Sequence, residues 1–165
     1  MEQTEPLSVQ DRMDIADVLA TYCLALDDRD WGRLAWVFTE DAVADYASRG
    51  VSQGLDAITG TVRAALEPLD ASQHFIGTSL VETDAEGVAG RTYLIAQHIA
   101  SGTPGGDAFT VAGTYIDRFV RTPDGWRIRH RQLSRVWTQG NPAVLSARSA
   151  ELAGDEDASS AEPRS

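Results

Sequence analysis

The chain has 165 residues, of which 42% are hydrophobic and 24% are charged, a composition typical of one soluble globular domain. Its 25 acidic residues outnumber 14 basic ones and give a net charge of -11, which argues against nucleic acid and anionic membranes as partners. Cys23 is the only cysteine and no apolar run is long enough to span a membrane, so we expect a cytoplasmic protein without an intrachain disulfide.

The first half of the chain has mainly helical periodicity. Ser8 begins a capping pattern for a helix that runs to about Asp27. The apolar face of this predicted helix consists of Ile15, Leu19, Tyr22 and Leu26. A short helix, a strand and a third helix are then predicted at residues 31–38, 42–48 and 54–66.

After residue 68 the hydrophobic pattern changes to period two, which is typical of strands. The four predicted strands are residues 73–82, 88–101, 109–121 and 126–138. Turns rich in Gly, Pro and Asp separate them, so they are expected to form consecutive hairpins. The predicted fold is α+β: three N-terminal helices cover one face of a curved antiparallel sheet. Its concave side would enclose a pocket for a small apolar or cyclic ligand, and its uncovered side suggests a homo-oligomer.

Composition also predicts the limits of the folded part. Residues 1–7 are expected to be a flexible leader and residues 8–142 the domain, whereas residues 143–165 form an acidic segment expected to be disordered. Either the loop at residues 102–107 or this C-terminal segment is a candidate to close the pocket, and the sequence does not distinguish them.

Two histidines lie inside runs that otherwise predict buried strands: His74 in SQHFIG and His98 in YLIAQH. Imidazole exchanges protons near neutral pH, so two of them on apolar strand faces suggest acid–base chemistry in a pocket. Taken singly, each is better explained as a core histidine with one hydrogen bond. Asp27, at the end of the first helix, could orient an imidazole from the pocket wall, although acids at a helix end are usually solvated or capping.

Tyrosines are the other candidate site residues. Tyr46 alternates with Ala42 and Ala44, and Tyr22 lies on the inner face of the first helix. Their hydroxyls could hold a water or polarise a carbonyl, but core packing explains each of them singly. Tyr115 lies on a strand of which either face could point inward. A metal site built from Asp27 and the two histidines is a minor alternative, because no pattern of residues that would hold these ligands in place accompanies it.

Several motifs in order resemble the SnoaL-like branch of the nuclear transport factor 2-like superfamily, over residues 9–140. They are ALDDRDWGRL at 25–34, DY at 45–46, QHFIG at 73–77, His98, GTY at 113–115 and DGW at 124–126. Within this branch the chain is most similar to scytalone dehydratases and also resembles hexachlorocyclohexane dehydrochlorinases. The resemblance implies a cone-shaped, mainly antiparallel sheet (a cystatin-like α+β barrel), no cofactor, and a homotrimer or homodimer.

The resemblance also implies roles for individual residues. Asp27 and His74 match an aspartate–histidine dyad, His98 a second catalytic histidine, and Tyr46 a catalytic tyrosine. The family's tyrosine before the helix-end aspartate is Leu26 here, and Tyr22, one turn earlier, is the candidate to replace it. Tyr22 and Tyr115 are the expected substrate-binding residues, and scytalone itself is not the expected substrate.

The leading hypothesis is a cofactor-independent lyase of the dehydratase type, acting on a small cyclic or polyketide-like substrate. His74, oriented by Asp27, would remove a proton, Tyr46 would polarise a carbonyl, and His98 would donate a proton to the leaving group. One alternative is a polyketide cyclase or isomerase with the same base. The other is a non-catalytic ligand-binding or assembly module, because fold does not determine function.

Overall fold

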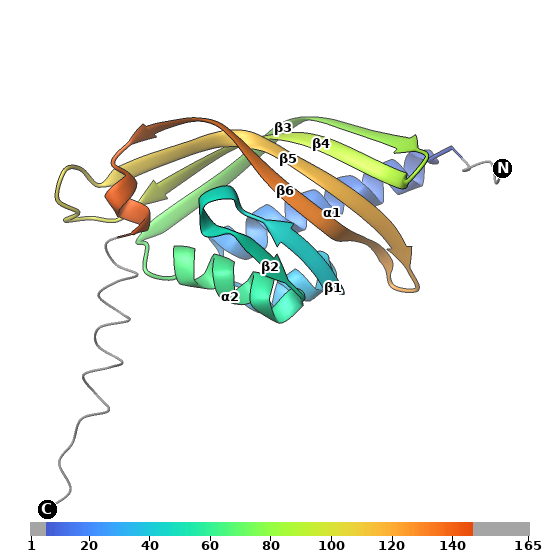
Figure 1. Ribbon diagram of the computed structural model, residues 1–165, viewed down its shortest axis with the longest axis horizontal. Coiled ribbons are helices and arrows are strands. Elements are labelled where there is room, and N and C mark those ends of the chain that lie inside the picture. Colours follow the sequence, from blue (N-terminus) through green and yellow to red (C-terminus); the bar gives the residue numbers. More distant parts are fainter. Residues whose placement is uncertain (1–5, 147–165) are drawn as a thin grey trace, which may run out of the picture.

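A long curved β-sheet organises the molecule, and the computed structural model describes it within residues 6–146 (Figure 1). The strands are β1 Phe38–Asp45, β2 Val51–Gln53, β3 Ala71–Asp84, β4 Gly87–Ile99, β5 Ala108–Thr122 and β6 Gly125–Gly140. Helices α1 Val9–Asp27 and α2 Leu55–Leu66 are accompanied by the short 3-10 helices η1 Trp31–Trp36, η2 Ala47–Arg49 and η3 Pro142–Leu145. Both α-helices lie on the same side of the sheet, as predicted (Figure 1).

The strand order is β2-β1-β6-β5-β4-β3, and the sheet does not close on itself. All neighbouring strands are antiparallel except β1 and β6, which are parallel. Helix α1 begins with the expected capping box, in which the Ser8 hydroxyl accepts from the Asp11 backbone amide. The four apolar residues predicted for its inner face, Ile15, Leu19, Tyr22 and Leu26, are all buried. The α+β prediction with a curved, mainly antiparallel sheet is therefore confirmed.

The boundaries differ most around the first strand. The predicted helix at 31–38 ends at Trp36, and β1 already begins at Phe38 because Phe38 is buried in the core and bridges to Ile128 of β6. Residues 46–48 were predicted as the end of this strand. They instead form a turn that leads into the short strand β2, which the sequence did not predict. Gly50, with a φ of 80°, closes this turn in the left-handed conformation that favours glycine.

A bulge changes the inward face of β3. His74 and Ile76 point toward the core, and in an uninterrupted strand Thr78 and Leu80 would share their face. The register instead shifts between Gly77 and Ser79, and Thr78 has a φ of 46°. An extra residue at this position reverses the alternation, so Leu80 is exposed.

The ordered C-terminal part extends past the predicted domain limit. Residues 143–145 were predicted to belong to a disordered segment, but they lie in η3, and Val144 is packed in the core with 1% exposure. The apolar run from Pro142 to Leu145, which precedes the polar residues, explains the difference. Of the predicted leader at 1–7, residues 1–5 lie outside the described residues, as does the acidic segment from 147, whereas Leu7 is partly buried against the core.

A buried ion pair joins the two central strands. Asp117 of β5 and Arg131 of β6 face each other, and two guanidinium nitrogens donate to the carboxylate at 2.8 Å each. Both side chains are almost inaccessible, at 1% and 0% exposure. The Arg131 guanidinium also lies 4.2 Å from the ring centre of Tyr22 and 4.0 Å from that of Tyr115. This cation thereby connects α1 to the sheet beneath the concave surface.

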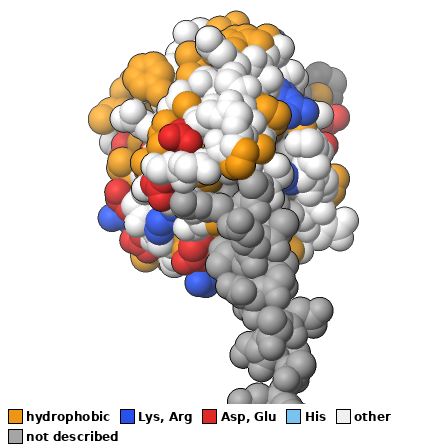
Figure 2. All heavy atoms as spheres, turned by 90° about the vertical axis from the view of Figure 1, so that its left-hand side faces the viewer, with side chains coloured by type: hydrophobic (Ala, Val, Ile, Leu, Met, Phe, Trp, Pro, Cys, Tyr) orange, Lys and Arg blue, Asp and Glu red, His pale blue; other side chains and the backbone are white. Residues whose placement is uncertain are grey.

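The outer face of the sheet exposes large apolar side chains. Phe75 and Ile95 are paired across β3 and β4, and both are exposed together with Tyr93 and Trp137. The predicted homo-oligomer would cover such a face, and it stays a prediction. Figure 2 shows another side, the end near the β4–β5 loop, where acidic and basic side chains of described residues intermingle without a continuous basic patch. No helix within residues 6–146 is sufficiently long and apolar to cross a membrane.

The buried pair yields a stability prediction. Asp117→Ala should lower the free energy of unfolding by about 3–5 kcal/mol, because it leaves the Arg131 charge buried without its carboxylate. The matched control is Asp84→Ala, which removes an exposed partner of Arg118 and should cost about 1 kcal/mol or less. Urea unfolding of both variants measures the difference, and equal losses would contradict an organising role for the buried pair.

Candidate functional site

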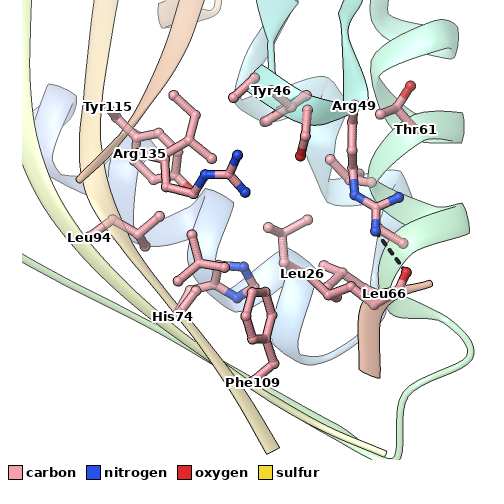
Figure 3. Close-up of a pocket in the computed structure, with 18 of the residues that line it drawn as sticks. Leu26, Tyr46, Arg49, Thr61, Leu66, His74, Leu94, Phe109, Tyr115 and Arg135 are labelled. Carbon is pink, nitrogen blue, oxygen red and sulfur yellow. Dashed lines mark hydrogen bonds between the residues drawn. The ribbon is translucent and has the colours of Figure 1, made fainter. Parts of the chain in front are cut away.

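The concave side of the sheet and the two helices enclose a cavity of about 680 Å³. Its lining is mainly apolar, with residues from α1, α2, β3, β4, β5, β6 and η3. Figure 3 shows His74, Tyr46, Tyr115, Arg49 and Arg135 arranged around this space. The volume suits a small cyclic molecule, and the few polar groups are in positions to orient it.

Asp27 and His74 are directly paired. Asp27 Oδ1 lies 2.6 Å from His74 Nδ1, and Asp27 Oδ2 accepts from the His74 backbone amide at 2.8 Å. The Ser72 hydroxyl also donates to Oδ1, at 3.2 Å. A carboxylate can only accept, so the proton of a neutral His74 ring lies on Nδ1. Nε2 then carries the free lone pair, and His74 lines the cavity.

Burial alone would raise the pKa of Asp27, but the hydrogen bonds from the His74 ring and backbone outweigh it and the net pKa is lowered. Asp27 is also the last residue of α1, where the helix dipole disfavours a negative charge. These donors therefore keep the carboxylate ionised at an electrostatically unfavourable position. An ionised Asp27 stabilises positive charge on His74 when its ring accepts a proton.

Arg29, which the sequence analysis did not identify, fixes the end of α1. It adopts a left-handed conformation with a φ of 59°, and the Asp30 amide bonds back to the Ala25 carbonyl at 2.9 Å, as in a Schellman-type helix end. The Arg29 guanidinium donates to the hydroxyl of Ser72 at 2.7 Å, which itself contacts Asp27. Arg29 thus ties the helix end to β3 and holds the dyad in register.

His98 lies beside His74 rather than in the cavity wall. The ring centroids are 5.8 Å apart and nearly perpendicular, and His98 is 5% exposed and absent from the residues that line the cavity. His98 Nδ1 lies 3.1 Å from the Phe109 carbonyl, which requires a proton on Nδ1. Burial, and then the unfavourable interaction of a protonated His98 with His74 and Arg49, outweighs the bond to the Phe109 carbonyl and lowers the pKa of His98 to about 4. His98 is therefore neutral at neutral pH.

The hydroxyls of Tyr22 and Tyr46, two candidate residues from different elements, are directly hydrogen-bonded. The Tyr22 hydroxyl donates to the Tyr46 hydroxyl at 3.1 Å, which leaves the Tyr46 proton free to be donated, and both residues line the cavity. Burial raises the pKa of Tyr22, and that of Tyr46 well above its usual value, so both hydroxyls stay protonated. Their arrangement provides a neutral hydrogen-bond donor within an apolar cavity.

Tyr115 faces inward, which settles the choice that the sequence left open between the two faces of β5. It lines the cavity with 3% exposure and packs edge-on against Tyr22, with ring centroids 5.7 Å apart. The next inward residue on this strand is Asp117, the partner of Arg131. Tyr115 therefore supports the Tyr22 ring as well as the cavity wall.

Two arginines of the cavity were missed. Arg49 lies in η2 after Tyr46, and Arg135 follows Leu133 on the inward face of β6, opposite Gly113. Because side chains alternate along a strand, Arg135 would be expected on the same face as Leu133. The sequence does not show that this face points into the cavity, so the pattern alone did not identify Arg135. Nothing in the sequence around Arg49 distinguishes it from an exposed turn residue.

Residues of η3, and none of residues 102–107, contribute to the cavity wall. Pro142, Leu145 and Ser146 are among the lining residues, and the Leu145 carbonyl accepts from Arg49 at 3.1 Å. Asn141 donates to two carbonyls of the β4–β5 loop, Pro104 and Gly106, and holds that loop beside η3. Within residues 6–146, no three His, Cys, Asp or Glu side chains are grouped to hold a metal ion.

A family model described as the SnoaL-like domain matches residues 8–132, most of the chain. The chain belongs to this family. Among curated relatives of this SnoaL-like protein, the uncharacterized protein Rv2910c of Mycobacterium tuberculosis is 32% identical over 124 residues, covering 74% of this chain and 84% of the relative. The terrestric acid biosynthesis cluster protein E of Penicillium crustosum is 32% identical over 144 residues, covering 84% of this chain and 91% of the relative.

Solved structures share the fold. The Kfla4162 protein of Kribbella flavida superposes with a TM-score of 0.75 at 23% identity, covering 82% of this chain and 97% of that protein. A proposed scytalone dehydratase of Novosphingobium aromaticivorans gives 0.72 at 21% identity, covering 81% and 89%. A hexachlorocyclohexane dehydrochlorinase of Novosphingobium barchaimii gives 0.71 at 17%, covering 81% and 92%. The expected nuclear transport factor 2-like, cystatin-like architecture is thereby confirmed.

The low pKa of His98 predicts a pH-dependent stability. An unfolded histidine has a pKa of about 6.5, so between this value and about 4 the unfolded chain binds a proton that the folded chain does not. Stability therefore falls as pH decreases through this window, and from pH 7 to pH 5 the loss due to His98 should be about 2 kcal/mol. Urea unfolding of the native protein and His98→Gln at both pH values measures it. An identical pH dependence in both proteins would contradict the assignment.

Proposed function

We propose that this protein is a lyase of the dehydratase type that needs no cofactor for its reaction and acts on a small cyclic or polyketide-like carbonyl compound. The observation that carries the proposal is the Asp27–His74 pair, whose free Nε2 belongs to a residue of the cavity wall. The resemblance of the site motifs to dehydratases and dehydrochlorinases, two classes of eliminating enzymes, supports the same reaction type.

The first step is proton removal by His74. Its Nε2 takes a proton from the carbon next to the substrate carbonyl, and the ionised Asp27 at 2.6 Å stabilises the resulting imidazolium. Electron density moves onto the carbonyl oxygen, and the Tyr46 hydroxyl, polarised by its bond from Tyr22, donates to that oxygen. The intermediate is an enolate held in an apolar cavity.

The second step is loss of water. The enolate reforms the carbonyl, the bond between carbon and the β-hydroxyl breaks, and the proton on His74 Nε2 passes to the departing hydroxide. One proton leaves carbon and one water leaves the substrate, and His74 returns to its neutral form. His98 was the predicted donor for this step, but its pKa of about 4 leaves Nε2 unprotonated at neutral pH, and the proton on Nδ1 is bonded to the Phe109 carbonyl. We assign His98 instead to positioning the His74 ring, against which it packs.

The names of relatives support this area of chemistry. The fold neighbours include a proposed scytalone dehydratase and a dehydrochlorinase, and the Penicillium relative is named as a protein of a terrestric acid biosynthesis cluster. The mainly apolar lining of the cavity favours a compact cyclic skeleton over an extended polar one.

A cyclase or isomerase is the second candidate. It is favoured by the presence of a single paired base with one hydroxyl donor, a set that is sufficient to move a proton between two carbons without eliminating water. Product mass separates the two reactions, because elimination lowers it by one water and isomerisation leaves it unchanged. A protein that only binds ligands would form no new compound of either mass.

The dyad yields a kinetic prediction. With a panel of cyclic β-hydroxy ketones, the native protein should release water, and His74→Ala and Asp27→Asn should each lower the rate by at least about 10²-fold. Mass spectrometry of the products measures this loss, and circular dichroism checks that both variants remain folded.

Two exposed residues of the same types, His130 and Asp28, supply matched controls. His130→Ala and Asp28→Asn make the same chemical changes outside the cavity and should leave the rate unchanged. Full activity in either dyad variant would rule out His74 as the paired base.

A further inference from the structure

The mouth of the cavity has an unbalanced positive charge. Arg49 and Arg135 line it, and no Asp or Glu is among the lining residues. Neither arginine forms an ion pair with another residue of 6–146, although acidic residues outnumber basic ones in the chain as a whole. Figure 3 shows the two side chains reaching the same space from different elements.

The two guanidinium groups are presented differently. One nitrogen of Arg49 donates to the Leu145 carbonyl at 3.1 Å, which fixes the side chain and leaves its other donors available. Arg135 is directed inward by the register of β6, where it pairs with Gly113, a position without a side chain to compete for the space. The Arg135 side chain forms no hydrogen bond with another described residue.

Two like charges that face one cavity repel each other. An anion between them would remove the repulsion and satisfy the free donors. The planar guanidinium fork matches a carboxylate in particular, because two parallel N–H groups can meet its two oxygens.

We infer that the substrate is an anion, an apolar cyclic skeleton bearing a carboxylate, and that Arg49 and Arg135 bind this carboxylate at the mouth. Arg49 and Arg135 are solvent-exposed, whereas Tyr46 and Tyr22 are buried. The carboxylate therefore stays at the entrance while the carbonyl end enters first, toward the tyrosines. This inference rests on the proposed function for the identity of the reacting end, but the binding preference itself does not require turnover.

Calorimetric titration with 2-naphthoate and 2-naphthamide tests the inference, since the two molecules share a skeleton and differ in charge. Near neutral pH the native protein should bind 2-naphthoate at least about tenfold more tightly, the range expected for a charge-assisted hydrogen bond. Arg135→Gln and Arg49→Gln should each remove most of this preference while leaving the affinity for 2-naphthamide unchanged.

Arg129→Gln is the matched control, because Arg129 lies on the same strand as Arg135, pairs with exposed Asp41 and does not line the cavity. It should keep the preference. Equal affinity for the two probes, no binding of 2-naphthoate at millimolar concentration, or equal weakening of both probes in the Arg49 and Arg135 variants would overturn the inference.

His74→Ala separates this inference from the proposed function. It should abolish turnover yet retain the preference for 2-naphthoate, and loss of the preference in this variant would show that His74, not the arginines, binds the anion. If the preference holds but His74→Ala still eliminates water, the proposed function fails and the anion site stands. If the preference is absent while the dyad remains essential, only the anion site fails.

Discussion

The contact between Asp27 and His74 joins the two layers of the molecule where the reaction is proposed to occur. Asp27 ends α1, and His74 lies on β3, the last strand of the open sheet. The carboxylate accepts from both the ring and the backbone of His74, so it orients the imidazole and at the same time holds an edge strand against the helix. Ser72 and Arg29 complete this junction, which makes the position of the base a consequence of how the helix ends.

A second polar contact, the ion pair between β5 and β6, supports the cavity wall that carries Tyr22 and Tyr115. Asp117 and Arg131 are buried across the central strands, and the guanidinium lies against the rings of Tyr22 and Tyr115. Burying a charged pair is costly, and such pairs often specify one arrangement more than they add stability. In this protein the pair places the Tyr22 ring, and Tyr22 in turn bonds Tyr46. The base is thus fixed by a hydrogen bond to a carboxylate, and the hydroxyl donor is fixed, through Tyr22, by a buried ion pair.

Local patterns were sufficient to predict the elements with strong periodicity. The capped helix α1, the four long strands and the α+β architecture follow from them, and the Asp27–His74 pairing agrees with the motif resemblance. Prediction failed where a single residue changes the geometry. The bulge at Thr78 reverses the inward face of β3. The turn at Gly50 leads into β2, which is too short to show a periodic pattern in the sequence.

The remaining site features depend on three-dimensional context. Arg135 reaches the cavity only because β6 pairs with β5 in one register, and Arg49 only because its turn folds over the cavity mouth. The environment of His98 is a matter of burial, which lowers its pKa and removes it from the role expected from its position in the sequence. Charge state and inward direction are properties of the assembled fold, so a single sequence does not reveal them.

The state of the His74 ring tests the central claim most directly, because it needs no substrate. Nitrogen-15 NMR of the imidazole distinguishes which ring nitrogen holds the proton in the neutral form. The Asp27 pairing predicts a proton on Nδ1 with a strongly downfield proton resonance in the native protein, and loss of that resonance in Asp27→Asn. A proton on Nε2 in the native protein, or identical spectra in both proteins, would contradict the assignment of His74 as an Asp-oriented base.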